Sequence, residues 1–466
     1  MPVRQWFGIG LATMLGGTTA VNAQSLQQAT NNGPAAVSAP SPVIVMPSRD
    51  GSMLRVQYQE QAPGNQEQAP GGAQPGRMEQ QAEASQTPGE GSGLGPTAPN
   101  KVNILQELLG LDTEKPTLQV FGWVDPDYTY RNSGHGINNI APVMNRFGDE
   151  FLMREIVLNV NKPLDSKDWS WGFNSTLLAG SDGAFLQPTA GWFKQTDPRF
   201  GFSFTDLNVT AHLPILTEGG VDVKFGRTTT VLGPMGGLAP YRYFDSSDYA
   251  WYNLEEGRYT GLSTIWHISK QLSWFNAIEL GGWGSFYDFT VAGPDYLGQI
   301  NYWFDEEAKR TLFTFTVLTG PTGHFNNGNT TAIETTIRQN WSDYVYQVVS
   351  FQMVYSKAPV LQAVPPGYQQ RAYDIYSYQG YHLSPCLDLN SRVEWYRDVD
   401  GGFYPGGFGT PDTNYEEVTL GFDYHPYKWI QIRPEIRGDF ASHEAFGQFH
   451  DRRNQLSIAC DALIKF

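Results

Sequence analysis

The final stretch of the chain, from Asn454 to Phe466, alternates between apolar and polar residues up to its last position. Counted back from Phe466, every second residue is apolar, namely Ile464, Ala462, Cys460, Ile458 and Leu456. Four of the six residues between them are polar. A period of two predicts a β-strand with one dry face and one mostly wet face. We expect this strand to run to the terminal Phe, without a tail.

Segments with a similar alternation of apolar and polar residues recur throughout the chain from Thr117 onward. Each is about ten residues long and is bounded by turn-type residues, as expected of β-strands. They cover residues 118–131, 169–181, 202–213, 220–233, 311–320, 331–341, 387–399, 416–424 and 428–440. Repetition on this scale predicts an all-β fold, with room for about sixteen antiparallel strands (range about 12–18).

Two of these segments show which residues share a face. In residues 429–440 the apolar face carries Ile430, Ile432, Pro434, Ile436 and Phe440, and the polar face carries Gln431, Arg433, Glu435, Arg437 and Asp439. In residues 387–398 the apolar face carries Leu387, Leu389, Val393 and Trp395, and the polar face carries Asp388, Asn390, Arg392, Glu394 and Asp398. Strands of soluble sandwiches average about five or six residues, whereas about ten tilted residues cross a bilayer. Pro434 cannot donate to a strand ladder, so we expect a bulge there.

The connections between the segments alternate in length. Short joints such as 163–168, 214–220 and 425–428 alternate with long ones at 132–149, 187–199, 233–256, 320–330, 358–370, 401–413 and 441–453. Aromatic residues gather near the short joints: Trp169, Trp171, Trp341, Tyr344, Tyr424, Tyr427 and Trp429. Short turns at one rim, long loops at the other and aromatic girdles are typical of a transmembrane β-barrel of the bacterial outer membrane. Closing such a barrel pairs its last strand with its first, which explains a strand that ends on Phe466.

The residues before the barrel divide into three parts. Residues 1–23 have a basic start, a short apolar stretch and an Ala-type cleavage site at Ala23, which predicts a cleaved signal peptide. Residues 24–100 are rich in Pro, Gln and Gly, so we expect a disordered segment. Residues 101–116 predict a short amphipathic helix, packed on the next domain or acting as a plug or a docking element. The barrel is then expected over residues 117–466.

Several other functions are disfavoured by the sequence. A net charge of -16 argues against nucleic acid as a partner. Cys386 and Cys460 offer neither a disulfide framework nor a metal-ligand spacing. The stretch from Ser133 to Asn139 resembles a phospholipase motif but has Asn138 where the nucleophilic Ser would stand. Residues 398–402 lack the full pattern of a calcium loop. We therefore expect no enzymatic activity, no metal and no cofactor.

From Val120 to Phe466 the chain resembles the OmpL-like β-barrel porins of bacterial outer membranes. The resemblance is carried by residues 121–130, "FGWVDPDYTY", by residues 223–233, "VKFGRTTTVLG", by residues 243–262, "YFDSSDYAWYNLEEGRYTGL", and by the terminal strand. The chain departs from the family pattern at Pro126, where a small residue is usual. The resemblance implies a passive channel, without assigned substrate residues.

A barrel of this size encloses an aqueous lumen. The polar faces then predict the pore lining: Lys224, Asp388, Asn390, Arg392, Glu394, Glu417, Asp423, Arg433, Glu435, Arg437 and Asp439. In sixteen-stranded porins the third long loop folds into the lumen, so the resemblance implies that residues 233–256 form the constriction. Its charged residues would be Arg242, Asp245, Asp248, Glu255 and Glu256.

Charge balance suggests the selectivity. Of the 47 acidic and 31 basic residues, 9 and 6 precede Thr117, which leaves 38 and 25 and a net charge of -13 for the barrel. Acidic rings favour cations, so we expect a porin for small hydrophilic solutes with a mild cation preference. The expected partners are outer-membrane lipid, the barrel assembly machinery through the Phe466 strand, and a possible second and third copy in a homotrimer. The alternative is a structural barrel whose disordered tail anchors a periplasmic partner, with little conductance.

Overall fold

The computed structural model describes most of the chain after residue 103. The described ranges are 45–47, 53–55, 104–113, 116–132, 145, 147–186, 199–255, 257–280, 294–306, 309–321, 329–356, 370–401, 412–447 and 451–466. The chain divides into two compact units, Met1–Gly72 and Ala73–Phe466. Of the first unit, only the strands β1 (Val45–Pro47) and β2 (Met53–Arg55), which pair antiparallel, are described. The predicted signal peptide and disordered segment otherwise lie outside the described residues.

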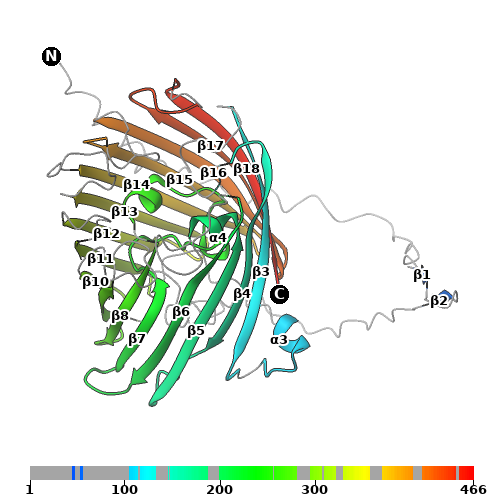
Figure 1. Ribbon diagram of the computed structural model, residues 1–466, viewed down its shortest axis with the longest axis vertical. Coiled ribbons are helices and arrows are strands. Elements are labelled where there is room, and N and C mark those ends of the chain that lie inside the picture. Colours follow the sequence, from blue (N-terminus) through cyan, green and yellow to red (C-terminus); the bar gives the residue numbers. More distant parts are fainter. Residues whose placement is uncertain are drawn as a thin grey trace, which may run out of the picture. The chain divides into compact units, whose positions relative to one another are not determined.

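Sixteen antiparallel strands of the second unit close into a barrel, as the sequence predicts (Figure 1). Each strand pairs with its neighbours in the sequence, and β18 pairs with β3 to close the ring. The strands are β3 (Gln119–Arg131), β4 (Glu150–Lys162), β5 (Ser170–Gly180), β6 (Gly201–Leu213), β7 (Val221–Thr229), β8 (Arg258–His267), β9 (Leu272–Leu280), β10 (Pro294–Trp303), β11 (Thr311–Gly320), β12 (Thr330–Asn340), β13 (Val345–Ser356), β14 (Gln370–Ser384), β15 (Leu387–Asp398), β16 (Thr413–Tyr427), β17 (Ile430–Ala441) and β18 (Asn454–Lys465).

The seam of the barrel explains the terminal Phe. The Phe466 amide donates to the Gly122 carbonyl, and the Gly122 amide donates to the Phe466 carbonyl, both at 2.9 Å. A Cβ added at Gly122 would lie only 2.7 Å from the Phe466 ring. The first strand therefore has a Gly where the terminal aromatic ring packs against it. The strand predicted from alternation is hydrogen-bonded to its last residue.

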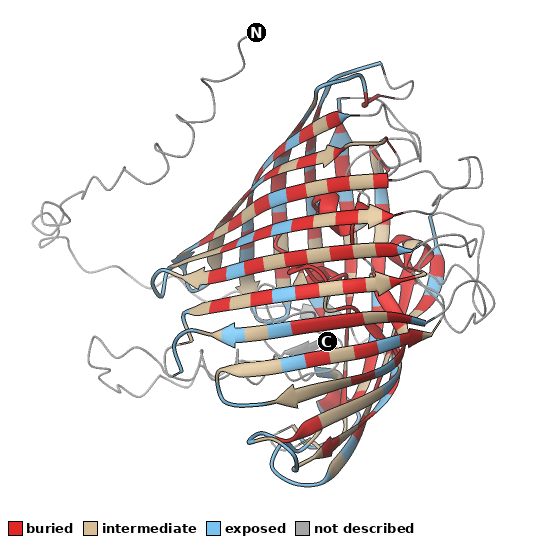
Figure 2. Ribbon diagram, turned by 90° about the vertical axis from the view of Figure 1, so that its left-hand side faces the viewer, coloured by how far each residue is buried: buried red, intermediate tan, exposed pale blue. Residues whose placement is uncertain are grey.

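The two faces of the wall differ as the alternation predicts (Figure 2). Outward side chains are exposed, for example Val418, Ile436 and Ile458 at 51%, 46% and 48%. Inward neighbours such as Glu417 and Arg437 are fully buried. The seven aromatic residues predicted to form a girdle are all exposed near the short turns. No helix among the described residues is both long and apolar enough to cross a membrane.

The expected bulge at Pro434 is wrong. Pro434 points outward and lies opposite Cys460 of β18 in an unshifted register. On its other side the ladder with β16 has no paired residues at Arg433 and Pro434, and its register shifts further along, between Tyr424 and Tyr427. A register shift does occur at Pro126 of β3, between Asp125 and Pro126, where β3 faces β4. This shift leaves one extra residue in β4. As a result the consecutive residues Arg154 and Glu155 are both completely buried on the inner side.

The connections differ from the sequence prediction in one respect. Sixteen strands require eight long connections, and the prediction missed the one between β9 and β10, residues 281–293. The connection between β5 and β6 contains the short helix α4 (Ser181–Phe185). Before the barrel, the short helix α3 (Ile104–Leu108) is attached to the start of β3. The side-chain amide of Gln106 donates to the carbonyl of Leu118, just before β3, and accepts from the backbone amide of Val120.

Candidate functional site: the loop inside the barrel

The chain between β7 and β8, residues 230–257, folds into the barrel and not away from it (Figures 1 and 2). It contains the 3-10 turn η1 (Ala239–Tyr241) and the helix α5 (Tyr249–Asn253). Ala239, Ala250 and Leu254 are completely buried, and the loop is packed against the inner faces of the strands. We call residues 230–257 the inner loop.

Arginines of the wall hold the carbonyl groups of the inner loop. Arg433 of β17 donates from Nη1 to the carbonyls of Ala239 at 2.7 Å and Arg242 at 2.8 Å. Arg437 donates to the Ser247 carbonyl at 2.5 Å, and Arg392 of β15 donates to the Ser246 carbonyl at 3.0 Å. Buried backbone groups that belong to no strand or helix need such partners. The wall thus supplies hydrogen bonds that the loop cannot make within itself.

Glutamates of the wall hold the amide groups of the same loop. Glu155 accepts from the Ala239 amide at 2.9 Å, and Glu334 of β12 accepts from the Gly233 amide at 2.8 Å. Glu394 accepts from the amides of Tyr249 and Ala250 at 2.7 and 3.2 Å, and Glu435 accepts from the Ser246 amide at 3.1 Å. Charged acceptors make stronger hydrogen bonds than neutral ones. The inner loop is therefore anchored on β4, β12, β15 and β17.

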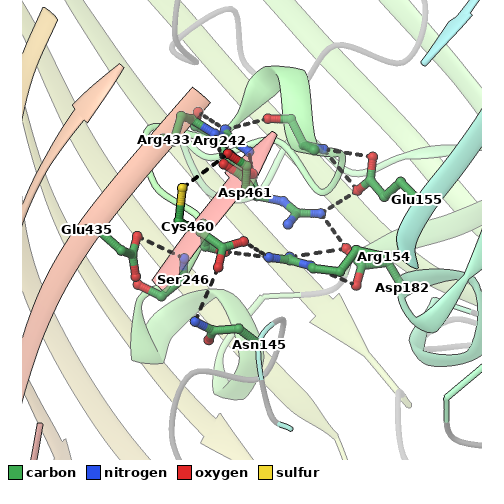
Figure 3. A network of polar contacts seen from close by, with 12 residues as sticks. Asn145, Arg154, Glu155, Asp182, Arg242, Ser246, Arg433, Glu435, Cys460 and Asp461 are labelled. Carbon is green, nitrogen blue, oxygen red and sulfur yellow. Dashed lines mark hydrogen bonds and ion pairs between the residues drawn. The ribbon is translucent and has the colours of Figure 1, made fainter. Parts of the chain in front are cut away.

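A network of buried ion pairs joins the loop to β4 and α4 (Figure 3). Arg242 of the loop contacts Glu155 at 2.5 Å and Asp182 at 2.8 Å. Arg154 contacts the same Asp182 at 3.2 Å and also pairs with Asp245 of the loop. Burial alone would favour the neutral acid at Asp182, but the two guanidinium groups hold its pKa below the ordinary value.

Aromatic stacking completes the packing between loop and wall. The Tyr249 ring lies 5.6 Å from Tyr396 and 5.5 Å from Tyr415, measured between centroids. The Tyr243 ring lies 4.8 Å from Tyr378. Burial raises the pKa of Tyr243 to about 12, so its hydroxyl stays neutral. The β14–β16 side of the barrel therefore packs against the loop as a true protein core.

Charge is distributed unevenly around the inner loop. Five wall and loop arginines each pair with a carboxylate: Arg154 with Asp182, Arg242 with Glu155, Arg392 with Glu417, Arg433 with Asp461 and Arg437 with Asp439. A second group of carboxylates, which we call the acidic cluster, comprises Asp248, Glu255, Glu334, Asp374 and Glu394. Among the described ion pairs, none involves a member of this cluster. Burial and the neighbouring carboxylates Asp248 and Glu334 raise the pKa of Glu255 well above its ordinary value.

The structure places the predicted pore-lining residues on the inner face of the wall. Asn390, Arg392, Glu394, Glu417, Asp423, Arg433, Glu435, Arg437 and Asp439 are buried there, whereas Lys224 and Asp388 are partly exposed. Of the predicted constriction residues, Arg242, Asp245, Asp248 and Glu255 lie in the inner loop and are buried. Glu256 lies outside the described residues. The phospholipase-like stretch 133–139 also lies outside them. The role of these residues in permeation stays a prediction.

Sequence reasoning missed several members of the site. Arg154, Glu155 and Asp182 were not among the candidates, and neither were Glu334 and Asp461. The sequence does mark Arg154 and Glu155, because two adjacent charged residues interrupt the alternation of residues 151–160. No comparable signal marks Asp182, which lies in a connection. Within the described residues, no group of His, Cys, Asp and Glu has a geometry that could hold a metal ion.

Comparisons with known proteins agree with this architecture. The sequence family described as beta-barrel porin-2, OmpL-like, matches residues 117–466. Among solved structures, an anion-selective porin from Comamonas acidovorans is similar, with a TM-score of 0.52 and 11% identity over 75% of this chain and 99% of that one. Salmonella typhi OmpF in complex with daunomycin has a TM-score of 0.51 and 10% identity over 75% and 97% of the two chains. At these identities the likeness concerns the fold alone. No curated protein sequence matches significantly.

Proposed function

The chain belongs to the OmpL-like family of β-barrel porins of the bacterial outer membrane, and we propose that it is a narrow diffusion channel for small hydrophilic solutes with a mild preference for cations. The observation that carries the proposal is the inner loop, which is held across the lumen by side chains from several strands. A loop fixed in this way narrows a barrel whose diameter would otherwise leave a wide aqueous lumen.

The acidic cluster supports the cation preference. Five of the arginines near the inner loop are ion-paired with carboxylates, so their charges largely cancel for a passing ion. Arg258 and Arg338 are further buried basic residues of the inner face. The acidic cluster has no such match among the described ion pairs and leaves a surplus of negative charge on the β12–β15 side. Because burial and the neighbouring carboxylates raise the pKa of Glu255, this residue keeps its proton to a higher pH than an ordinary glutamate does. We therefore expect a weak preference that increases with pH.

Dense packing supports a second candidate, a structural barrel with little conductance. At the height of the inner loop, inward side chains on opposite sides of the ring are almost free of solvent contact, for example Thr316, Ser350 and Asp461. In that case, the segment before residue 117 would bind a periplasmic partner. This candidate and the channel differ in one measurable quantity, the ion current through the purified protein.

Single-channel recording of the refolded full-length protein tests the proposal. In planar bilayers we expect discrete steps, and a reversal potential in a KCl gradient that indicates a modest excess of K⁺ over Cl⁻ permeability. The excess should shrink in 1 M salt, where the Debye length is about 3 Å. A correctly folded barrel without steps would favour the structural candidate. A clear Cl⁻ preference would contradict the role given to the acidic cluster.

Removal of the inner loop tests the constriction itself. We expect that replacing Leu238–Asp248 by a short Gly-Ser linker raises the single-channel conductance severalfold, because the obstruction is removed while Arg433 keeps Asp461 as its partner. A linker of the same composition that replaces the exposed residues 442–444, in the connection after β17, serves as the control and should leave conductance nearly unchanged. Equal conductance of the wild type and the inner-loop deletion would show that this loop does not limit the current.

A further inference from the structure

The histidines of the barrel strands all lie at one end of the lumen. His212 is the last residue but one of β6, and His267 is the last of β8. His382 of β14 and His425 of β16 each lie two residues before the end of their strand. All four precede short turns, which place them at the periplasmic mouth of an outer-membrane barrel. The remaining described histidine, His443, is in a long connection at the opposite end.

Each of these four imidazoles contacts an aspartate of the inner face. Asp222 of β7 lies between two of them, with Oδ1 at 2.6 Å from His212 Nδ1 and Oδ2 at 2.9 Å from His267 Nε2. His382 Nδ1 lies 2.7 Å from Asp388 Oδ1. His425 Nε2 lies 3.0 Å from Asp423 Oδ1. A carboxylate beside an imidazole accommodates either its neutral or its protonated form.

Three of the four histidines are open to solvent. The side chains of His267, His382 and His425 are 22%, 21% and 29% exposed, whereas His212 is 1% exposed. We call these three the vestibule histidines. They lie on the periplasmic side of the buried inner loop, so protons and solutes can reach them without passing the constriction.

The fixed charges that face the vestibule histidines are of both signs. His267 faces Asp222, which lies near Lys224 on the same strand, and the polar Ser273 of β9. His382 faces Asp388 of β15 and stacks on Tyr346 of β13, whose ring lies 6.0 Å from the Arg338 guanidinium. His425 faces Asp423, which accepts from Gln431 of β17 and lies near Lys465 of β18. Each vestibule histidine thus has a carboxylate beside it and a basic residue nearby, so protonation of the histidines adds positive charge to a mouth that carries both signs.

We propose that the vestibule histidines act as specificity-determining residues that shift the channel from cations toward small anions when the periplasmic side is acidified. The inference deepens the proposed channel function and rests on it. Histidine changes its charge between about pH 8 and pH 5. Three added positive charges at a mouth that carries both signs raise the local concentration of anions and lower that of cations. The substrate class at low pH would include small carboxylates and inorganic anions.

One-sided acidification in planar bilayers tests the inference. The orientation is read from native Cys386 in the short turn between β14 and β15, which a membrane-impermeant maleimide reaches only from the periplasmic side. Lowering the pH on that side from 7.5 to 5.5 should reduce the ratio of K⁺ to Cl⁻ permeability of the wild type by at least about threefold at 0.1 M salt. Acidification of the opposite side alone should have a smaller effect.

Glutamine variants isolate the histidines from the other acids of the lumen. In the triple variant His267→Gln, His382→Gln and His425→Gln, we expect the response to periplasmic pH to fall to less than half of that of the wild type. His443→Gln is the matched control and should respond as the wild type does. If the triple variant does not fold, His425→Gln alone should lose about a third of the response, since it removes one of the three exposed imidazoles.

The outcomes separate this inference from the proposed function. Conductance at pH 7.5 with an unchanged pH response in the triple variant, or an equal response from both sides, would overturn the role of the histidines and leave the channel intact. No conductance at any pH in the folded wild type would overturn both.

Discussion

Replacing Arg433 by Gln should destabilise the folded barrel by about 3–5 kcal/mol, the usual cost of removing one partner of a buried ion pair. Arg433 is 1% exposed and is hydrogen-bonded to Asp461 of β18. It also donates to the carbonyls of Ala239 and Arg242 in the inner loop. The substitution therefore removes the donor of the buried Asp461 carboxylate and of the Arg242 carbonyl, while the Ala239 carbonyl keeps the Arg242 amide at 3.2 Å.

A double variant and an exposed arginine supply the controls for this prediction. Arg433→Gln with Asp461→Asn should be clearly less destabilised than Arg433→Gln alone, because the buried charge is removed together with its partner. Arg371→Gln breaks an exposed pair with Asp400 and should cost no more than about 1 kcal/mol. Urea unfolding in lipid vesicles, followed by tryptophan fluorescence, gives the free energies. A cost for Arg433→Gln that equals the cost for Arg371→Gln would contradict the anchoring role.

Replacing Ile458 by Arg should cost about 2–4 kcal/mol, the penalty of a basic residue on the lipid-facing side near the bilayer midplane. Ile458 lies in the middle of β18, is 48% exposed and is paired with Ile436 of β17 and Tyr130 of β3, whose side chains are exposed on the same outer face. A guanidinium at this position would face hydrocarbon instead of water.

The control for Ile458 is a polar position on the inner face of the wall. Asn301 of β10 faces the lumen near the short turns and is partly exposed, so Asn301→Arg should cost less than about 1 kcal/mol. The same unfolding assay compares the two variants. Equal losses at both positions would show that the assignment of the outer and inner faces is wrong.

The alternation of apolar and polar residues is enough to define the wall of the barrel. The alternation in residues 429–440 assigned Arg433 and Arg437 to the inner face and Ile432 and Ile436 to the outer one, and the structure confirms this. The terminal alternation predicted a last strand that pairs to the end of the chain. Such inferences succeed because strand periodicity is local: the side chain at each position is placed by its neighbours two residues away.

The positions of β-bulges could not be predicted from the alternation. A bulge was expected at Pro434, but this residue pairs with Cys460 of β18 in an outward position without a shift in register. A shift does occur at Pro126 and turns both Arg154 and Glu155 inward. A proline in a strand lacks the amide hydrogen that the ladder needs. Whether the strand or its partner then gains an extra, unpaired residue depends on how the two strands pair. That pairing is a tertiary property.

The groups that the inward charges bind could not be inferred from the alternation. The pattern indicated that Arg433 and Glu394 face the lumen, and water was their expected surrounding. They are instead bound to the backbone of the inner loop, about 190 and 145 residues away in the sequence. Carbonyl and amide groups are the same at every residue, so the sequence carries no mark that distinguishes the ones an arginine or a glutamate will bind. Closure of the barrel brings them together, and the cost of burying unpaired backbone groups then selects these contacts.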